Sequence, residues 1–589
     1  MAISKIILNS QHKDNVEFTG TEAVRITQGT TAERANAQAG DLRFNSTTSL
    51  MEYYDGVRWK SIDSPPVISS VSPQYFGAAG ETITITGGNF QSGAEVYLIG
   101  QDSTEYKASV VTVNSSTSIT FTTTSAMNTA GGANDLFGVK VVNTTSSLTA
   151  TLTDALDYGA DAVFTTSQGS IGNIYDIDRG DKTFTIGATS IDSDDTISLA
   201  VTSGSLPTGM SMNTSGVISG TPSQETAGSS STYNFTVTAT VTGEIETFTS
   251  TRNFSITVFG LIATTYDVTG DDRDGALNVF TIPAGLTKLQ TKMWGGGGGS
   301  YYDGSGNNGQ GGSAGFTDTT FNVLSGEAYY TIITAGGGGA NARAGYGGGG
   351  GGVNGGSAGG GASMILSGNI STPFLQQDSY GIGNLNSEPS STTSSLSPVT
   401  GVIAVAGGGG GGGWYVVNNQ HGGNGGGLTG GAGSGYWGTG TTPGGTQTAG
   451  GSGKPYSQGG SYLLGGNVTN NASNGGSGGG GGGFYGGGCW QGSTGGENNG
   501  GGGGSGFAGY VDGTSSTVLT ATGSYSSYTD TTTRTNGDRT YTNTSIIRSA
   551  DRSTTAAGTS DSYYSGTIGN GAAIGSNAAG SPGRVVVIY

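Results

Sequence analysis

The chain is poor in most of the residues that carry protein chemistry. Its 589 residues include one Cys, two His and twelve Pro, and charged residues make up only 11%. A single Cys cannot form an internal disulfide or a Cys-rich metal centre. The two His residues, His12 and His421, are distant in sequence and too few for a multi-His metal site. We therefore expect neither a disulfide framework nor a metal centre built on these residues.

Positive charge and long apolar runs are also scarce. The 22 basic residues are outnumbered by 40 acidic residues, which gives a net charge of −18. Binding to nucleic acid through phosphate neutralisation is excluded because it needs clustered Lys and Arg. No stretch approaches the roughly 18–20 apolar residues that insertion into a membrane requires. Residues 1–9 also lack the apolar core of a signal peptide. We expect a protein that is made in a cytoplasm and stays soluble or leaves within an assembly.

Glycine is abundant and unevenly distributed. Residues 1–290 contain 28 glycines, and residues 291–589 contain the other 90. The first part is rich in Thr, Ser, Val and Ile in short alternating runs, separated by turn residues. No window shows a sustained helical period, so we predict an all-β fold. The clearest predicted strands are 81–86, 108–113, 137–142, 233–239 and 254–258.

Two predicted domains resemble known Ig-like families. Residues 65–158 begin after the stiff linker Asp63-Ser-Pro-Pro-Val67 and resemble IPT/TIG domains, through Pro66–Pro73, Gly80 and Ile83–Phe90. Residues 159–259 resemble the cadherin-like repeats called putative-Ig domains. Their matching segments are Gly204–Met210 and Ser215–Pro222. The resemblance implies two Ig-like β-sandwiches that serve as spacers or adhesive modules rather than as enzymes.

The N-terminal part, residues 1–64, contains a short module that resembles one found in bacteriophage tail-fibre and virion proteins. The matching segments are Gly29–Arg34, Ala39–Asn45 and Glu52–Lys60. This resemblance implies attachment to a virion. Such a module has little core of its own. We expect Phe44, Tyr53 and Trp59 to form a small aromatic cluster that is buried between copies of a homotrimer.

The glycines of residues 260–589 occur in runs rather than at every third position, which excludes collagen. A flexible linker is one interpretation. Against it, predicted strands at 288–294, 328–335 and 401–406 lead directly into glycine runs, and a further strand closes the chain at 584–589. We predict a small β-head with packed polyglycine-II helices, whose backbone groups bond between neighbouring helices. The main runs are 295–299, 336–339, 347–352, 407–413, 478–483 and 500–504.

The same half resembles a glycine-rich domain family of phage and bacterial surface proteins and of one group of receptor tyrosine kinase ectodomains. The segments that carry this resemblance are Thr281–Leu289, Met293–Gly297, Ala404–Gly409 and Gly583–Ile588. Distal adhesins of some T-even-like phages use a similar polyglycine sandwich, and their loops bind the host receptor. Two Ser/Thr-rich excursions, 371–400 and about 511–565, depart from the glycine pattern. We expect each to cap the array or to act as a recognition loop.

Aromatic residues beside the glycine runs are the candidate receptor-binding residues. Trp and Tyr stack on sugar rings and dominate binding hot spots. The alternative is that they form a small core at the ends of the array, and both interpretations stay open. The candidates are Trp414, Tyr415, Tyr436, Trp437, Tyr485 and Trp490.

Catalytic and metal-binding patterns are weak. His421 has no nucleophile motif around it, and Cys489 has the pattern of a packed small residue. Asp192, Asp194 and Asp195 could contribute to a Ca²⁺ site, but a solvated turn explains them better. No paired carboxylates show the pattern of a glycosidase. We expect no catalytic residues, no cofactor and no metal.

The sequence favours a non-enzymatic fibre or adhesin that is located on a virion. The N-terminus would bind other virion proteins of the tail, baseplate or head, and the glycine-rich domain would bind a host surface glycan or outer-membrane protein. Multivalent contacts would supply the affinity. Three alternatives stay open: a purely structural decoration or neck fibre, a bacterial surface adhesin, and a polysaccharide-depolymerising tailspike.

Overall fold

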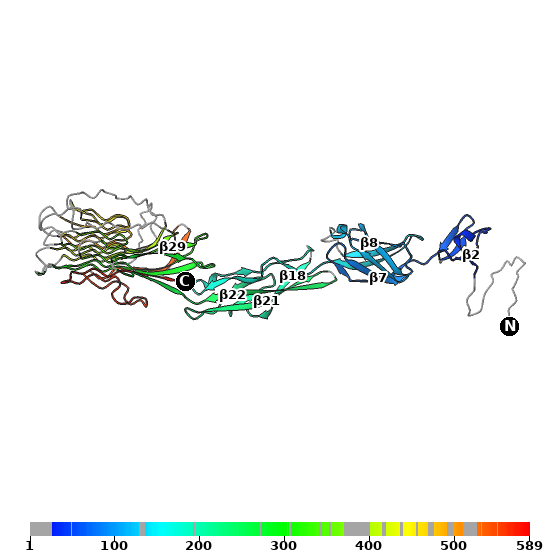
Figure 1. The fold of residues 1–589 in the computed structure, drawn as a ribbon, viewed down its shortest axis with the longest axis horizontal. Coiled ribbons are helices and arrows are strands. Elements are labelled where there is room, and N and C mark those ends of the chain that lie inside the picture. The colour runs from blue at the N-terminus through cyan, green and yellow to red at the C-terminus, as the bar shows by residue number, and fades with distance from the viewer. Residues whose placement is uncertain are drawn as a thin grey trace.

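The computed structural model places four folded parts in a line, with the N-terminal module at one extremity and the glycine-rich domain at the other (Figure 1). The structure describes residues 26–589 except positions 49, 129–135, 193–194, 244, 271–272, 303, 305–307, 341–343, 353–354, 370–400, 415–419, 436–439, 455–456, 469–475, 492–498, 510–526, 532, 537 and 551. The fold is nearly all β, which confirms the predicted class.

The N-terminal module is one small sheet in the order β1-β2-β3-β4. A short helix, η1 (Thr31–Glu33), lies between β1 and β2 along the chain. One face of the sheet carries buried polar residues. Glu52 is only 1% exposed and pairs with Arg34 and Arg43. Among the described residues, the module contributes nothing to a hydrophobic core cluster. The strands are β1 (Gln28–Gly29), β2 (Leu42–Asn45), β3 (Leu50–Tyr54) and β4 (Trp59–Ile62).

The second part is a β-sandwich. Its sheets have the orders β10-β11-β7-β5 and β6-β13-β12-β8-β9, and alternating apolar residues such as Ile83, Ile85, Phe121 and Val139 fill the space between them. The elements are β5 (Val67–Ser72), β6 (Tyr75–Phe76), β7 (Thr82–Gly88), β8 (Glu95–Ile99), β9 (Glu105–Lys107), β10 (Val111–Ser115), β11 (Ser118–Thr122), α1 (Ser125–Asn128), β12 (Phe137–Asn143) and β13 (Leu148–Tyr158).

The third part is a second sandwich, with sheets β15-β22-β21-β18 and β16-β20-β19 and the short pair β14-β17. Its core includes Ile174, Phe235, Val237 and Phe254. The elements are β14 (Val163–Phe164), β15 (Gly169–Tyr175), η2 (Arg179–Asp181), β16 (Phe184–Thr185), β17 (Ala188–Thr189), β18 (Thr196–Gly204), β19 (Met210–Met212), β20 (Val217–Gly220), β21 (Ser230–Thr242) and β22 (Thr247–Phe259).

The fourth part begins with a β-head of two packed sheets. One has the order β23-β36-β25-β28-β35-β33 with β34 paired to β35, and the other has the order β24-β29-β30-β31-β32. The strands are β23 (Ala263–Asp267), β24 (Ala276–Thr281), β25 (Lys288–Trp294), β28 (Phe316–Asn322), β29 (Tyr329–Thr334), β30 (Ser363–Ser367), β31 (Val402–Ala406), β32 (Phe507–Ala508), β33 (Ser527–Asp530), β34 (Arg534–Asn536), β35 (Arg539–Ile547) and β36 (Arg584–Ile588), with the separate pair β26 (Tyr301–Tyr302) and β27 (Asn308–Gly309).

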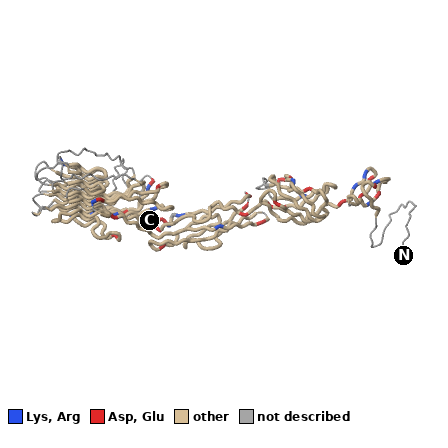
Figure 2. Tube along the Cα trace, viewed as in Figure 1, with Lys and Arg blue, Asp and Glu red and all other residues tan. Residues whose placement is uncertain are grey.

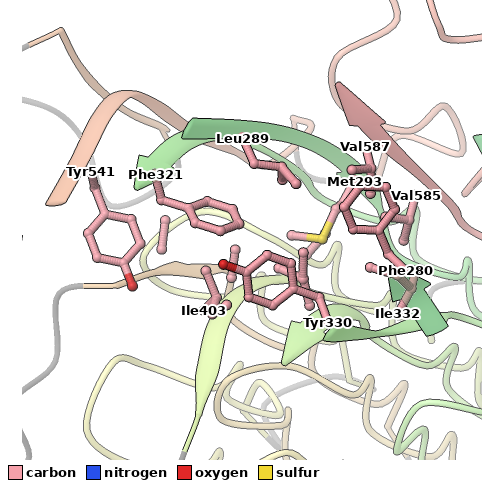
Figure 3. Close-up of a cluster of buried hydrophobic side chains, with 14 of the residues drawn as sticks. Phe280, Leu289, Met293, Phe321, Tyr330, Ile332, Ile403, Tyr541, Val585 and Val587 are labelled. Atoms are coloured by element: carbon pink, nitrogen blue, oxygen red, sulfur yellow. The ribbon is translucent and has the colours of Figure 1, made fainter. Parts of the chain in front are cut away.

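A hydrophobic core fills the space between the two sheets of the head (Figure 3). Leu289 and Met293 of β25 and Val585 of β36 face Tyr330 and Ile332 of β29 there. The excursion at 511–565 is not only a cap or loop, because its described part supplies β33, β34 and β35 to the larger sheet. The excursion at 371–400 lies outside the described residues.

The glycine segments leave and re-enter the head as extended chains that bond to one another with a period of three residues. Each N–H of residues 408–413 donates to a carbonyl of another segment at 2.7–3.0 Å. Three successive donors reach three different segments, and the next three repeat the order. The donor–acceptor pairs are Gly408–Gly482, Gly409–Gly296, Gly410–Gly423, Gly411–Gly479, Gly412–Gly299 and Gly413–Gln420.

The carbonyl groups of this segment repeat the same period with three further neighbours. The donors to residues 407–412 are, in order, Gly315, Gly504, Gly360, Gly312, Gly501 and Ser357. Segment 407–413 is therefore bonded to six surrounding segments. A side chain is excluded from such a contact, since a Cβ added to Gly409 would lie 1.9 Å from the carbonyl oxygen of Gly312. The buried backbone is satisfied without a hydrophobic core around it.

The joint between the second sandwich and the β-head is held by a buried carboxylate. Asp178 is 2% exposed and accepts hydrogen bonds from the N–H and the hydroxyl of Thr287, at 2.7 and 2.6 Å. Lys182 pairs with the same carboxylate at 3.1 Å. Tyr175 of the sandwich also contacts Tyr589 at the end of the chain, and their ring centroids are 6.2 Å apart. These contacts fix the glycine-rich domain to the preceding sandwich.

Candidate functional site

The two ends of the glycine array differ in chemistry. We call the end that continues into the strands the base and the opposite end the tip. At the tip, Trp414 exchanges backbone hydrogen bonds with Gly476 at 2.7 and 3.1 Å. Asn499 lies beside them, because its carbonyl accepts from Gly478 at 3.0 Å, and its side chain donates to Gly440 at 3.1 Å. Loops distant in sequence therefore meet at one end of the molecule (Figure 1).

The first aromatic group at the tip is the pair Tyr301 and Trp414. Their ring centroids are 6.0 Å apart and the planes meet at 69°, an edge-to-face contact. Both side chains are half-buried. Tyr301 also lies over Gly355, where an added Cβ would approach its ring to 2.9 Å. The pair is thus held in place by backbone on one side and remains partly open to solvent.

The second aromatic group combines Trp490 with Lys454. The Lys454 ammonium lies 4.4 Å from the Trp490 ring centroid, within the range of a cation–π contact. Gly440 approaches the edge of the indole, where an added Cβ would lie 3.2 Å from it. Trp490 is half-buried and Lys454 is exposed. A cation that lies over a half-buried indole ring is therefore exposed to solvent.

Ser457 fixes this second group by joining the two chain segments that carry it. Its hydroxyl accepts from the N–H of Lys454 at 3.0 Å and donates to the carbonyl of Cys489 at 2.7 Å. The N–H of Gln491 also reaches it at 3.4 Å. The Ser457 N–H donates to the Lys454 carbonyl at 2.7 Å, which closes the turn. The neighbours of Trp490 on both sides are thus bonded to the turn that carries Lys454.

The structure separates the predicted receptor-binding residues. Trp414 and Trp490 lie at the tip, whereas Tyr485 lies at the base. Tyr485 contacts Tyr462 and Phe484 edge-to-face, with centroids 5.7 and 5.4 Å apart, and packs against a buried core cluster. For Tyr485 the small-core interpretation is therefore the right one. Tyr415, Tyr436 and Trp437 lie outside the described residues. Sequence reasoning missed Tyr301 and Lys454, whose only signal is a position beside glycine-rich segments.

The predicted aromatic cluster of the N-terminal module does not form. Leu42 pairs with Tyr53 and Tyr54 pairs with Trp59 across the sheet, so Phe44 and Tyr53 share one face and Trp59 lies on the other. Trp59 instead contacts Tyr54, at 5.5 Å between centroids, and Arg43. The face of Phe44 and Tyr53 carries mainly apolar residues, together with Lys60 opposite Tyr53. Its most exposed members are Leu42 at 44%, Ile62 at 49% and Tyr53 at 36%.

The remaining candidates for chemistry, His421 and Cys489, are both buried. Burial lowers the pKa of His421, and Arg552 lowers it further. The His421 Nδ1 atom accepts from the Gln310 N–H at 3.3 Å. Burial also raises the pKa of the Cys489 thiol, which is fully buried. Both shifts favour the neutral forms, so the thiol is a poor nucleophile.

Carboxylates gather where the two sandwiches meet, without forming a metal centre. Burial raises the pKa of Asp195, and the charges of Asp192 and Asp157 raise it further, although a hydrogen bond from Ser190 opposes them. Asp194 lies outside the described residues. In the part of the chain that the structure describes, no three His, Cys, Asp or Glu side chains form a group able to hold a metal. No described helix is both long enough and apolar enough to cross a bilayer.

Comparison with protein families finds two matches. Residues 66–157 match the family described as "IPT/TIG domain", and residues 162–259 match the family described as "Putative Ig domain". Both ranges lie within the sandwiches described above. No curated protein sequence matches the chain.

The solved structures that match the chain are only distantly alike. Mouse cadherin-23 EC22-24 is 14% identical with a TM-score of 0.18, and covers 46% of this chain and 98% of its own. Human protocadherin-24 EC1-2 is 12% identical with a TM-score of 0.17, and covers 34% and 99%. Murine CEACAM1b is 11% identical with a TM-score of 0.18, and covers 32% and 99%. These scores are too low to support an argument. The two family matches stand on their own, and they show that the second and third parts of the chain resemble Ig-like domains in sequence.

Proposed function

We propose that the chain is a non-catalytic fibre on a virion, and that it binds the surface of a host cell through the tip of its glycine-rich domain. The observation that carries the proposal is the linear order of the four parts (Figure 1). The N-terminal module and the tip lie at opposite extremities, and two Ig-like sandwiches separate them. Families of this type are commonly spacers or adhesive modules, which supports a role in binding rather than in catalysis.

The glycine array is the second support. A threefold repeat of hydrogen bonds and six bonded neighbours are the features expected of a polyglycine-II array. We propose that the array is of this type. Backbone hydrogen bonds, together with the side chains of Asn499 and Ser457, hold the chain near Trp414 and Trp490, so these half-buried rings are presented at fixed places. Rigid aromatic residues at a tip suit a binding surface, because little conformational entropy is lost on contact.

The N-terminal module is the proposed point of attachment and self-association. Its outward face carries Leu42, Phe44, Met51, Tyr53 and Ile62, and its inward face holds an ion pair rather than a core. Contact with the surface of another protein chain would therefore stabilise the N-terminal module. We propose that copies of this chain associate here as a homotrimer, and that the module also contacts other virion proteins.

Binding of the full-length chain, labelled with a fluorophore, to intact bacteria and to their isolated envelopes tests the proposal. We expect binding to a subset of strains, reduced at least tenfold by Trp414→Ala because a hot-spot ring supplies about 2 kcal/mol or more. Tyr329→Ala is the control, because Tyr329 is 43% exposed in β29 of the β-head. Circular dichroism confirms that each variant is folded.

A folded chain that binds no envelope would contradict the proposal and leave a purely structural fibre. Equal loss with Tyr329→Ala would show that the tip is not the binding surface. Release of reducing ends from envelope polysaccharide by the wild-type chain would instead support the depolymerising tailspike.

A further inference from the structure

We infer that Trp490 and Lys454 form a subsite for a sugar residue that bears an anionic group, a carboxylate or a phosphate. The inference rests on the proposed function, since it names the class of ligand that the tip would recognise. An aromatic face stacks on a sugar ring, and an ammonium beside it pairs with an acidic substituent of that ring.

The charge distribution favours an anionic ligand here over the rest of the molecule. The chain carries a net charge of −18. Figure 2 shows the charged residues along the first three parts and in the β-head, whereas most of the described glycine array carries neither colour. Among the described residues near the tip, the exposed charged side chains include Lys454 and, beside Gln310 and His421, Arg552, and both are basic. An anionic polymer is thus repelled along most of the fibre and attracted at this point.

The geometry shows a subsite that is held ready rather than a chance contact. Lys454 lies in a turn closed by Ser457, and the same hydroxyl bonds the carbonyl of Cys489, next to Trp490. The two segments that carry the ammonium and the ring are therefore joined through one hydroxyl, and the ammonium lies 4.4 Å from the ring centroid. Beneath them, Cys489 is fully buried, and the N–H of Gly488 donates to the carbonyl of Pro443 at 2.9 Å. The pair is anchored to the array, as a binding site on a rigid support requires.

The Tyr301–Trp414 pair differs in a way that sharpens the inference. Its rings face one another edge-on, so it suits an uncharged ring or an apolar surface. A ligand that spans both groups would carry its acidic residue at Trp490. Loss of Lys454 should therefore alter selectivity, whereas loss of Trp414 should alter affinity for charged and neutral ligands alike.

Calorimetric titration of the full-length chain tests the inference with three probes: an oligogalacturonate, its methyl ester, and a phosphorylated oligomannose. We expect at least one anionic probe to bind about tenfold more tightly than the neutral ester. Lys454→Gln should remove that preference, and Lys454→Arg should keep it within about threefold. Lys107→Gln is the matched control, because this exposed lysine lies in the first sandwich and also contacts an aromatic ring, Tyr97. The arms with carboxylate and phosphate identify the source of the charge.

A signal local to Trp490 separates a direct contact from a loss of folding. With ¹⁵N-labelled protein, the anionic probe should shift the indole N–H resonance that disappears in Trp490→Phe. Raising the salt from 50 to 500 mM should weaken binding by the wild type and leave Lys454→Gln unchanged.

The inference is overturned if the ester binds as well as the acid, if Lys454→Gln keeps the preference, or if polyglutamate binds more tightly than any sugar probe. These failures differ from a failure of the proposed function. A chain that binds cells through Trp414 and ignores Lys454→Gln would retain the adhesin role without this subsite. A chain that binds no cell but binds the anionic sugar probe through Lys454 would retain this subsite and lose the adhesin role.

Discussion

Replacing Gly409 by Ala places a methyl group inside the glycine array. The added Cβ would lie 1.9 Å from the carbonyl oxygen of Gly312, while an ordinary contact needs about 3.4 Å. The two segments must therefore separate by about 1.5 Å. These two segments are joined by hydrogen bonds from the Gly312 N–H to the Gly410 carbonyl and from the Gly315 N–H to the Gly407 carbonyl, both at 2.8 Å, and both bonds would be lost or strained.

The expected cost follows from the groups that lose their partners. Two broken bonds leave four buried backbone groups unsatisfied, and each costs about 1–3 kcal/mol, so the free energy of unfolding should fall by about 4 kcal/mol or more. A domain of this size loses roughly 2–4 °C of melting temperature per kcal/mol, which predicts a decrease of about 10 °C. This decrease in melting temperature applies to the glycine-rich domain, whose array holds Gly409.

Differential scanning calorimetry of the full-length chain measures the effect, because the sandwiches should unfold in transitions of their own. Two matched variants define the comparison. Ala358→Gly removes a methyl that the array already holds at a buried position, and we expect a change of less than about 1 kcal/mol. Gly88→Ala adds a methyl where no atom lies within 4 Å, and it should be neutral. A melting temperature unchanged within 2 °C in Gly409→Ala would refute the close-packed description of the array.

Two further predictions concern two different places: the joint where the two sandwiches meet, and the N-terminal module. Burial and the neighbouring carboxylates raise the pKa of Asp195 above its ordinary value of 3.8, so the folded state binds its proton more tightly. Stability from this group is therefore present below pH 3.8 and is lost as the pH rises through the raised pKa. We expect Asp195→Asn to remove this pH dependence and to stabilise the third part at pH 7. Thermal unfolding measured across pH tests the expectation, and an unchanged profile in the variant would contradict it. In sedimentation velocity, Ile62→Lys should reduce the mass of the particle from that of a trimer to that of a monomer. Val57→Lys, at an 83% exposed position in the hairpin turn, should leave the mass unchanged. A wild-type chain that is monomeric at micromolar concentration would contradict the proposed trimer.

The strands could be predicted from sequence because alternation and adjacent glycine mark them clearly. The predicted 288–294, 328–335, 401–406 and 584–589 became β25, β29, β31 and β36 with their limits moved by at most one residue. β35 was missed because its apolar residues, among them Tyr541 and Ile546, alternate within a Ser/Thr-rich stretch that resembles a loop. Its partner in the sheet, β28, is more than 200 residues away.

The sequence predicted that aromatic residues would line the tip, but it could not predict which of them lie there. Tyr485 and Trp490 flank the same short glycine segment, yet one lies at the base and the other at the tip. Nothing in a run of glycines reveals its direction, because both ends have the same composition. The face of Trp59 was equally out of reach, since a strand's faces follow from its pairing register. The Lys454–Trp490 contact depends on two loops that only the folded array brings together.

The position of β36 has a kinetic consequence. This strand lies between β23 and β25, and Arg584 pairs with Asp267 across a separation of 317 residues. The edge strand β23 thus cannot join the larger sheet until a segment synthesised long after it has arrived. Pairing across such a distance is slow because loop-closure entropy must be overcome first. We expect the sandwiches to fold during synthesis, while the domain that follows them waits for its final strand and then closes in a single late step.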